Sequence, residues 1–133
     1  MEKMKIYLTI CSGEKRKDRK LLEAIERYNY PRINKFYELS KKDKVEFRIL
    51  SGKFGLLKPE DKIPFYDKKL GEKDIEKLSE LVGRQIKKEK ITEIIFFVRN
   101  EKDWKPYIKV VENVCRNLEL VLKKWLFNEL NNH

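Results

Sequence analysis

The residues best suited to binding or chemistry are concentrated in one segment of the chain, from Ile49 to Asp67. Within it, Ser51-Gly52-Lys53-Phe54-Gly55 places a hydroxyl, a cation and two glycines directly after an apolar run. Glycines permit positive φ and a close backbone approach, which can expose N–H groups to an anion, and a lysine adds a point charge for phosphate or carboxylate. The spacing matches neither a Walker loop nor a dinucleotide fingerprint. The segment therefore indicates an anion site outside the standard motifs, or an ordinary turn shaped by two glycines.

Side chains of this segment are candidates for chemistry or ligand binding, and each has a structural alternative. Asp67 could act as a general base or bind sugar hydroxyls, or it could cap the turn after Tyr66. Tyr66 could stack on a base, or it could pin the long loop to the core. We therefore take Asp67 and Ser51 as catalytic candidates, and Lys53, Gly55 and Tyr66 as ligand-binding candidates.

Two further loops contain candidate residues. Cys11 could be a nucleophile whose thiolate is stabilised by Lys15 and other nearby cations, or it could be a small buried residue at a strand end. Ser12 and Lys15 are ligand-binding candidates in the same loop. Arg99 and Asn100 follow a strongly apolar run and could clamp an anion or a base edge.

The cysteines and the single histidine exclude several kinds of site. Cys11 and Cys115 are too few for a disulfide framework and lack the spacing of a zinc site. Cys115 lies on the apolar face of a predicted helix, so we expect it in the core. His133 is the only histidine, which removes histidine catalysis and histidine metal ligation. We therefore predict no metal site and no cofactor.

The elements that must position these residues follow from the apolar pattern. Short apolar runs predict strands at Lys5–Ile10, Val45–Ser51 and Glu93–Val98. Leu118–Leu122 could form a fourth strand or continue the helix before it. Gly52–Tyr66, with two glycines and two prolines, is predicted to be an ordered loop. The predicted helices are Leu21–Tyr28, Ile33–Leu39, Lys73–Ile86, one with Asp103 as N-cap and Pro106 in its first turn, and a terminal one at Lys123–Leu130.

Strands that alternate with helices predict a single α/β domain over residues 1–133. We expect three layers, with a mostly parallel sheet of about four strands and helices on both faces. Ligands bind such sheets at the carboxyl ends of the strands. The loops Cys11–Lys15, Ser51–Gly55 and Arg99–Glu101 each follow a predicted strand, so we expect them to meet in one site.

The composition bears on possible partners. The 32 Lys and Arg residues exceed the 22 Asp and Glu residues by ten, which favours a nucleic acid or another polyanion as partner. A charged fraction of 41% is also typical of proteins from hot environments, whose surfaces carry ion-pair networks. No apolar run approaches the roughly 20 residues of a membrane span or has the form of a secretory signal, so we expect a soluble, cytoplasmic protein.

The segment LSGKFGLLKPEDKIPFYDKKL resembles the signature of a small family of uncharacterised bacterial and archaeal proteins. That signature reads Leu-Ser-Ala-Lys-Tyr-Gly-Leu-Leu, then a Pro, then an ending similar to Ile-x-Pro-Tyr-Asp. The upstream CSGEKRK is similar to the family's Cys-Ser-x-x-Lys segment. Gly52 and Phe54 depart from the usual alanine and tyrosine. The matching residues are Cys11, Ser12, Lys15, Ser51, Lys53, Gly55, Leu56, Leu57, Pro59, Ile63, Tyr66 and Asp67.

The same pattern is similar to the YaaA family, whose members are linked to peroxide stress and DNA binding. This resemblance implies a nucleic-acid context. We therefore expect a nucleotide- or nucleobase-handling protein, an enzyme of nucleic-acid modification or repair being one form of it. Its partner would be a nucleotide or another phosphate-bearing ligand. The alternative is a non-catalytic module that binds DNA or RNA through its basic surface.

Overall fold

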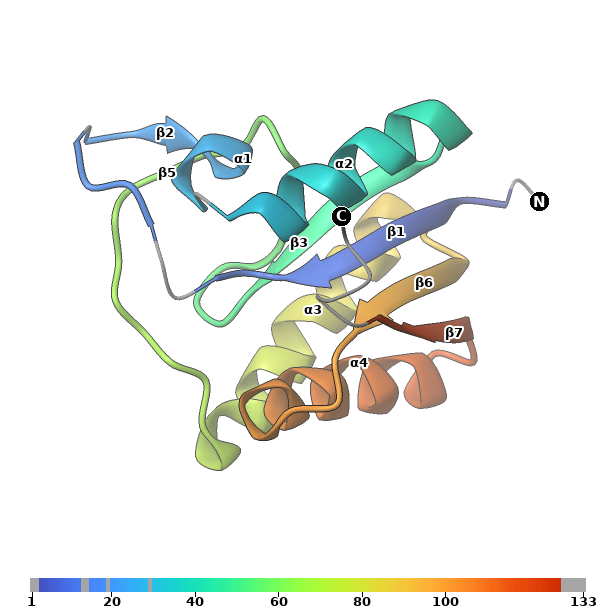
Figure 1. Cartoon of the computed structure of the whole chain (residues 1–133). Coiled ribbons are helices and arrows are strands. Elements are labelled where there is room, and N and C mark those ends of the chain that lie inside the picture. Colours follow the sequence, from blue (N-terminus) through green and yellow to red (C-terminus); the bar gives the residue numbers. More distant parts are fainter. Residues whose placement is uncertain (1–2, 13–14, 19, 29, 128–133) are drawn as a thin grey trace.

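The computed structural model describes residues 3–12, 15–18, 20–28 and 30–127 of the chain. The centre of this part is a five-stranded sheet with the strand order β4-β3-β1-β6-β7 (Figure 1). Its strands are β1 (Lys5–Ile10), β3 (Glu46–Ser51), β4 (Gly55–Leu57), β6 (Glu93–Val98) and β7 (Val121–Leu126). All neighbouring strands are parallel except β3 and β4, which are antiparallel.

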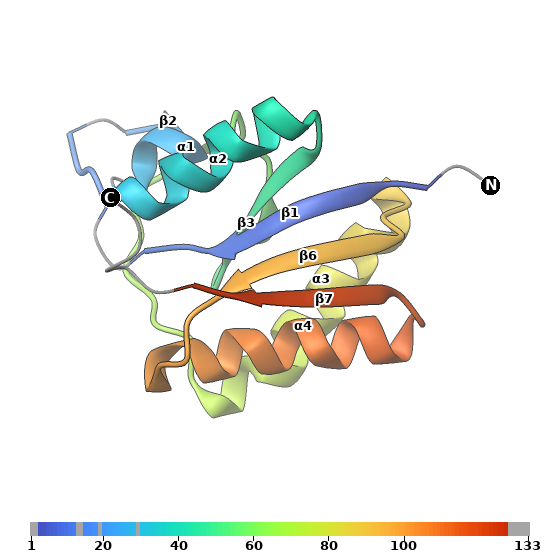
Figure 2. The same cartoon turned by 45° about the vertical axis from the view of Figure 1, so that its right-hand side comes forward.

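Helices cover both faces of the sheet (Figures 1 and 2). One face carries α1 (Ala24–Arg27) and α2 (Pro31–Asp43), and the other carries α3 (Ile75–Glu89) and α4 (Lys105–Asn117). The 3₁₀ turns η1 (Glu72–Asp74) and η2 (Lys102–Trp104) lead into α3 and α4. A short antiparallel pair joins β2 (Leu22–Glu23) to β5 (Lys62–Ile63). The predicted three-layer α/β architecture with a mostly parallel sheet is therefore confirmed.

The central strand β1 shows why the sheet needs helices on both sides. Ile6 and Leu8 belong to a buried cluster with residues of α3 and α4, such as Val82. Tyr7 lies in a second cluster, together with Ile33 of α2. Because side chains alternate between the faces of a strand, a strand with apolar residues in succession is stable only when both faces are covered.

The predicted strands agree with β1, β3 and β6 to within one residue. The prediction of a loop at Gly52–Tyr66 is wrong in part, because this segment contains β4 and β5. The register of β4 pairs Ser51 with Gly55 and Ile49 with Leu57. Three apolar or small residues after a turn are too short a run to be recognised as a strand by periodicity. These residues form a strand because their backbone pairs with β3.

The C-terminal prediction is corrected by the structure. α4 ends at Asn117, so Leu118–Leu122 does not continue it, and the fourth parallel strand is instead Val121–Leu126. The terminal helix predicted at Lys123–Leu130 is wrong for its first four residues, which belong to β7; residues 128–130 lie outside the described part. β7 pairs with β6 from Glu93↔Val121 to Val98↔Leu126, and these backbone hydrogen bonds outweigh the helical spacing of a few apolar residues.

Two smaller predictions about helices also change. The helix predicted at Leu21–Tyr28 is limited to α1, because Leu22 and Glu23 pair with β5. Asp103 is not a helix N-cap: it lies inside η2, and α4 begins at Lys105 with Pro106 in its first turn as expected. Within the described residues, no helix combines the length and apolar character that crossing a membrane requires.

The carboxyl ends of β1, β3 and β6 lie at one edge of the sheet, as the parallel pairing requires. A segment without regular structure, residues 64–71, crosses this edge between β5 and η1 (Figure 1). We refer to it as the strap. The buried side chains of Tyr66 and Leu70 anchor the strap to the core. The edge, the loops that follow the strands and the strap together frame the candidate site.

Candidate functional site

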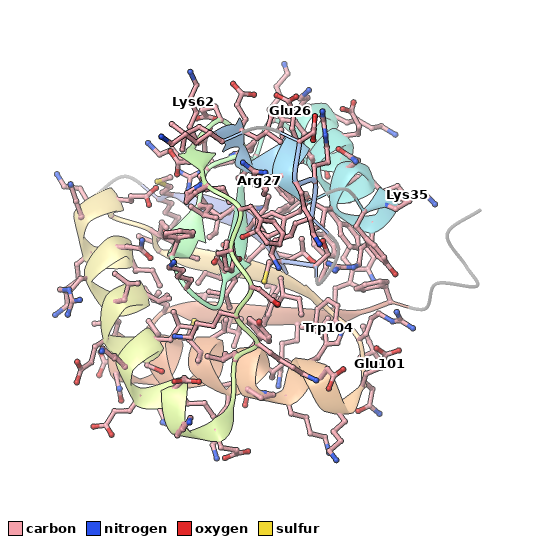
Figure 3. The ribbon with its side chains drawn as sticks, turned by 90° about the vertical axis from the view of Figure 1, so that its left-hand side faces the viewer. Glu26, Arg27, Lys35, Lys62, Glu101 and Trp104 are labelled. Carbon is pink, nitrogen blue, oxygen red and sulfur yellow. The ribbon has the colours of Figure 1, made fainter. Side chains whose placement is uncertain are left out.

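A hollow of about 500 Å³ opens at this edge, and we refer to it as the edge hollow. The loop after β1 contributes Cys11, Ser12 and Lys15, and the strap contributes Asp67 and Lys68. Its lining also includes Tyr30, Arg32, Lys69, Arg99, Glu101, Asp103, Trp104 and Tyr107. Figure 3 looks onto this side of the molecule, where the strap crosses in front and Trp104 and Glu101 lie close together near the start of α4. The edge hollow therefore joins two of the three predicted loops.

A larger groove, of about 770 Å³, lies along α3 and α4. Its lining mixes acidic side chains such as Glu76 and Glu80 with basic ones such as Arg84 and Lys109. None of the predicted site residues lines this groove. We therefore take the edge hollow as the candidate site.

Arg32 is the most strongly positioned cation of the edge hollow. The residue is 7% exposed, and its Nη1 donates to Thr9 Oγ1 at 2.8 Å and to the carbonyl oxygen of Ile10 at 3.1 Å. Its guanidinium carbon lies 5.1 Å from the ring centre of Tyr30 and 4.9 Å from that of Trp104. The end of β1 and two aromatic rings thus hold a planar guanidinium in one orientation, which suits recognition of phosphate or carboxylate.

The edge hollow carries more positive than negative charge. Lys69 pairs with Asp103 at 3.1 Å, and Arg99 pairs with Glu101 at 2.6 Å. Lys15 Nζ lies 4.6 Å from the ring centre of Tyr66. Within the described part of the chain, neither Lys15 nor Lys68 has a carboxylate partner. The electrostatic potential of the hollow therefore favours an anionic ligand.

A cluster of hydroxyl groups extends from the floor of the edge hollow into the core. The thiol of Cys11 contacts the Tyr107 hydroxyl at 3.7 Å. Deeper, the hydroxyl of Tyr66 bonds to that of Tyr28 and, at 2.8 Å, to Ser51 Oγ. Burial raises the pKa of Tyr28, Tyr66 and Tyr107 well above the ordinary value of a phenol. These phenols are therefore neutral at physiological pH and act as hydrogen-bonding groups.

The structure places the predicted site residues in two groups. Cys11, Ser12, Lys15, Asp67 and Arg99 all line the edge hollow. Ser51 and Tyr66 do not: both are buried, at 0% and 5% exposure, and their hydroxyls bond to each other. Of the two alternatives for Tyr66, the structure agrees with the one in which it pins the loop to the core.

Three backbone amides of the turn after β3 have partners within the protein. Ser51 Oγ accepts the amide N–H of Lys53 at 3.1 Å and that of Phe54 at 3.0 Å. The amide N–H of Leu56 donates to Gln85 Oε1 at 2.7 Å. Gly55 has φ +72° and begins β4, so its conformational freedom serves the turn. These three amides are therefore not available to an anionic ligand.

Lys53 and Asn100 lie apart from the edge hollow. Lys53 lines a second, smaller hollow of about 280 Å³ on the other side of the strap, and Lys68 lines both. Asn100 is exposed and is not among the residues that line either one. Lys53 and Arg99 therefore line different hollows, and Lys68 of the strap borders both.

Sequence reasoning missed Arg32 and the aromatic residues around it. Arg32 follows Pro31 at the start of a helix, and no local pattern distinguishes it from a solvent-exposed arginine. Trp104 of η2 and Tyr107 of α4 are both buried while also lining the hollow. Among the described residues, no group of three or more His, Cys, Asp or Glu side chains is arranged to hold a metal ion.

A family model described as a family of unknown function (DUF6884) matches residues 6–127, which include the edge hollow and all the described strands and helices except Lys5, the first residue of β1. No curated protein and no solved structure shows a significant match to the chain.

Proposed function

The chain belongs to the DUF6884 family, whose function is unknown, and from the geometry of its site we propose that it binds a nucleotide in the edge hollow. In this proposal Arg32 and Lys15 hold the phosphate, while Tyr30 and Trp104 form the apolar side of the base site. The observation that carries the proposal is the guanidinium of Arg32, held at the carboxyl end of β1 with its carbon 5.1 Å from the ring centre of Tyr30 and 4.9 Å from that of Trp104. Anionic groups are expected at this edge of a parallel α/β sheet.

Aromatic and cationic groups occur together in the edge hollow, which favours a nucleotide over a simple anion. Inorganic phosphate needs only cations, whereas a nucleotide also presents a flat base that stacks on aromatic rings. Tyr30 is half-buried, lies against Arg32 and lines the edge hollow, so a base in the hollow would lie close to its ring. The base-stacking role first considered for Tyr66 thus passes to Tyr30 in this proposal.

A reaction on the bound nucleotide would involve Cys11 or Asp67. Both line the edge hollow, and the thiol of Cys11 is half-buried beside Tyr107. Ser51 has no such access, because it is buried and its oxygen already accepts two amide groups. A nucleotide ligand also agrees with the cytoplasmic location expected from the sequence.

Calorimetric titration with the nucleoside 5′-monophosphates tests the proposal. We expect binding by the native chain and about tenfold weaker binding by Lys15→Gln, because one charge-assisted contact to phosphate is lost. Lys17→Gln is the matched control: it makes the same charge change two residues away, and Lys17 lies over Phe65 outside the edge hollow. Both variants should unfold at the temperature of the native chain.

Two results would contradict a nucleotide site. One is the absence of heat or of thermal stabilisation with every nucleotide at millimolar concentration. The other is an equal loss of affinity in Lys15→Gln and Lys17→Gln, since that would show an effect of net charge alone. The second result would instead support the alternative of a module that binds nucleic acid through its basic surface.

A further inference from the structure

The second hollow has an unusual charge balance. Its lining includes Lys53 from the β3–β4 turn, Lys68 from the strap, and Lys77 and Arg84 from α3. The only acidic side chain among its lining residues is Asp74. These cations come from three separate segments of the chain, so their convergence is a property of the fold and not of one basic helix face.

None of these four cations is neutralised by an ion pair within the described residues. The edge hollow differs in this respect, since Lys69 and Arg99 there have carboxylate partners. Like charges gathered around a concave surface repel one another, and a bound anion relieves that repulsion. The second hollow is therefore suited to an anionic group of a ligand.

The two hollows are neighbours. Lys68 lines both of them. Gly52, which lines the second hollow, lies so close to Tyr107 of the edge hollow that an added Cβ would be 3.1 Å from the tyrosine hydroxyl. A ligand with one group in the edge hollow can therefore extend past Lys68 into the second hollow.

We propose that the ligand is a single-stranded nucleic acid, with one nucleotide in the edge hollow and the neighbouring backbone phosphate in the second hollow. This inference rests on the proposed function. An unpaired strand is required because a base can enter a hollow only when it is free of its partner. The chain also carries ten more positive than negative charges, which is more than the negative charge of a single nucleotide would balance.

Binding of fluorescein-labelled strands of about eight nucleotides, as RNA and as DNA, tests this inference by anisotropy at physiological salt. Unlabelled nucleoside monophosphates and triphosphates are compared by calorimetry. The test variant is Lys77→Gln/Arg84→Gln. The matched control is Lys42→Gln/Lys88→Gln, with the same charge change on exposed residues in the last turns of α2 and α3. Those turns lie at the opposite edge of the sheet, since β3 and β6 begin shortly after them.

We expect at least one type of strand to bind about tenfold or more tightly than its monophosphate. Lys77→Gln/Arg84→Gln should remove most of that gain, and should reduce the slope of log affinity against log salt by about 0.7, the value for one neutralised phosphate of a single strand. The affinity of this double variant for the monophosphate should equal that of the native chain. The control variant should keep most of the gain.

Each contrary result has a separate meaning. If the monophosphate binds but neither strand gains affinity, or if test and control variants lose it equally, the strand inference fails and the proposed function stands. A triphosphate that shows the full gain, and loses it in the test variant, would replace the strand by a polyphosphate ligand. If strands bind while Lys15→Gln has no effect on them, both the strand placement and the nucleotide site are wrong.

Discussion

Ser51 and Tyr66 form a buried hydroxyl pair behind the edge hollow. Ser51 Oγ lies 2.8 Å from the Tyr66 hydroxyl and also accepts the amides of Lys53 and Phe54. One serine oxygen thus fixes both the turn after β3 and the strap. At the scale of single residues, the site divides into groups that face the ligand, such as Lys15 and Arg32, and groups that hold the frame in place.

Ser51→Ala should therefore affect stability and not ligand affinity. Loss of the Ser51 hydroxyl leaves the amides of Lys53 and Phe54 without this acceptor and removes one of the two hydrogen bonds of the Tyr66 hydroxyl, so we expect the free energy of unfolding to fall by about 2–3 kcal/mol. Urea denaturation measures this change. Ser79→Ala is the matched control, because Ser79 Oγ is buried and has no hydrogen-bond partner among the described residues. A stable Ser51→Ala that no longer binds nucleotide would return Ser51 to the ligand site.

Not every residue of the site could be predicted from the sequence, because some of them are defined by packing between distant segments of the chain. The positions of Cys11, Ser12 and Lys15 could be anticipated, because they belong to a loop at a strand end, and the structure places all three at the edge hollow. Arg32 could not, because its importance depends on contacts with Thr9 and Trp104. Those contacts join residues that are far apart in the chain, so no local sequence pattern predicts them.

At the scale of elements, the side chain of Gln85 joins α3 to the β3–β4 hairpin by hydrogen bonds. Gln85 Oε1 accepts the amide of Leu56 at 2.7 Å, and its Nε2 donates to the carbonyl oxygen of Phe54 at 3.1 Å. Gly55 lies between these contacts with φ +72°. An added Cβ there would be 2.3 Å from Gln85 Oε1. The hairpin thus depends on a glycine for conformation and for space.

We expect Gly55→Ala to lower the free energy of unfolding by about 2–3 kcal/mol, since a left-handed alanine costs about 1–2 kcal/mol and Gln85 must also move. Gly83→Ala is the comparison. Gly83 lies within α3, and an added Cβ there meets no atom within 4 Å, so this change should stabilise the chain by about 0.5–1 kcal/mol. Equal effects of the two substitutions would contradict this description of the hairpin.

The elements that could be predicted are those whose own composition decides their structure. β1, β3 and β6 are apolar runs that are buried in any parallel sheet, and each was predicted to within one residue. β4 and β7 depend on the strand beside them: β4 is short, and β7 has mostly exposed side chains. Their backbone pairing with β3 and β6 is a tertiary interaction, which periodicity alone does not indicate.

At the scale of the whole molecule, topology positions the site. Parallel pairing of β1 with β3 and β6 brings their carboxyl ends together, and the edge hollow opens there as the strand order predicts. The expected convergence of three loops is realised for two of them, because the strap separates the turn after β3 from the edge hollow. The division of the predicted site into two hollows thus follows from how residues 64–71 cross the sheet.

The buried tyrosines make the stability of the whole chain depend on alkaline pH. The hydroxyl of Tyr7 donates to Asp43 Oδ2 at 2.6 Å, and this hydrogen bond, with burial, raises the pKa of Tyr7 to about 12. Below about pH 10, the ordinary pKa of a phenol, Tyr7 is protonated in both the folded and the unfolded chain, so its stabilisation is complete. Between about pH 10 and 12 the unfolded chain loses the proton first, and the free energy of unfolding falls.

Urea denaturation between about pH 9 and pH 12 measures this fall. Tyr7→Phe should show a shallower decline than the native chain, because the part that belongs to Tyr7 is removed while Tyr28, Tyr66 and Tyr107 remain. Stability that does not change with pH over this range, or the same decline in Tyr7→Phe, would show that Tyr7 is not shifted.

The central claim, a nucleotide site in the edge hollow, is tested most directly by amide chemical-shift mapping of the full chain during titration with a nucleoside 5′-monophosphate. We expect saturable shifts gathered at Cys11, Ser12, Lys15, Lys68 and Arg99, which line the hollow from three segments. The last turns of α2 and α3, at the opposite edge of the sheet, should not shift. An absence of shifts at millimolar nucleotide, or shifts confined to residues away from the edge hollow, would contradict the claim.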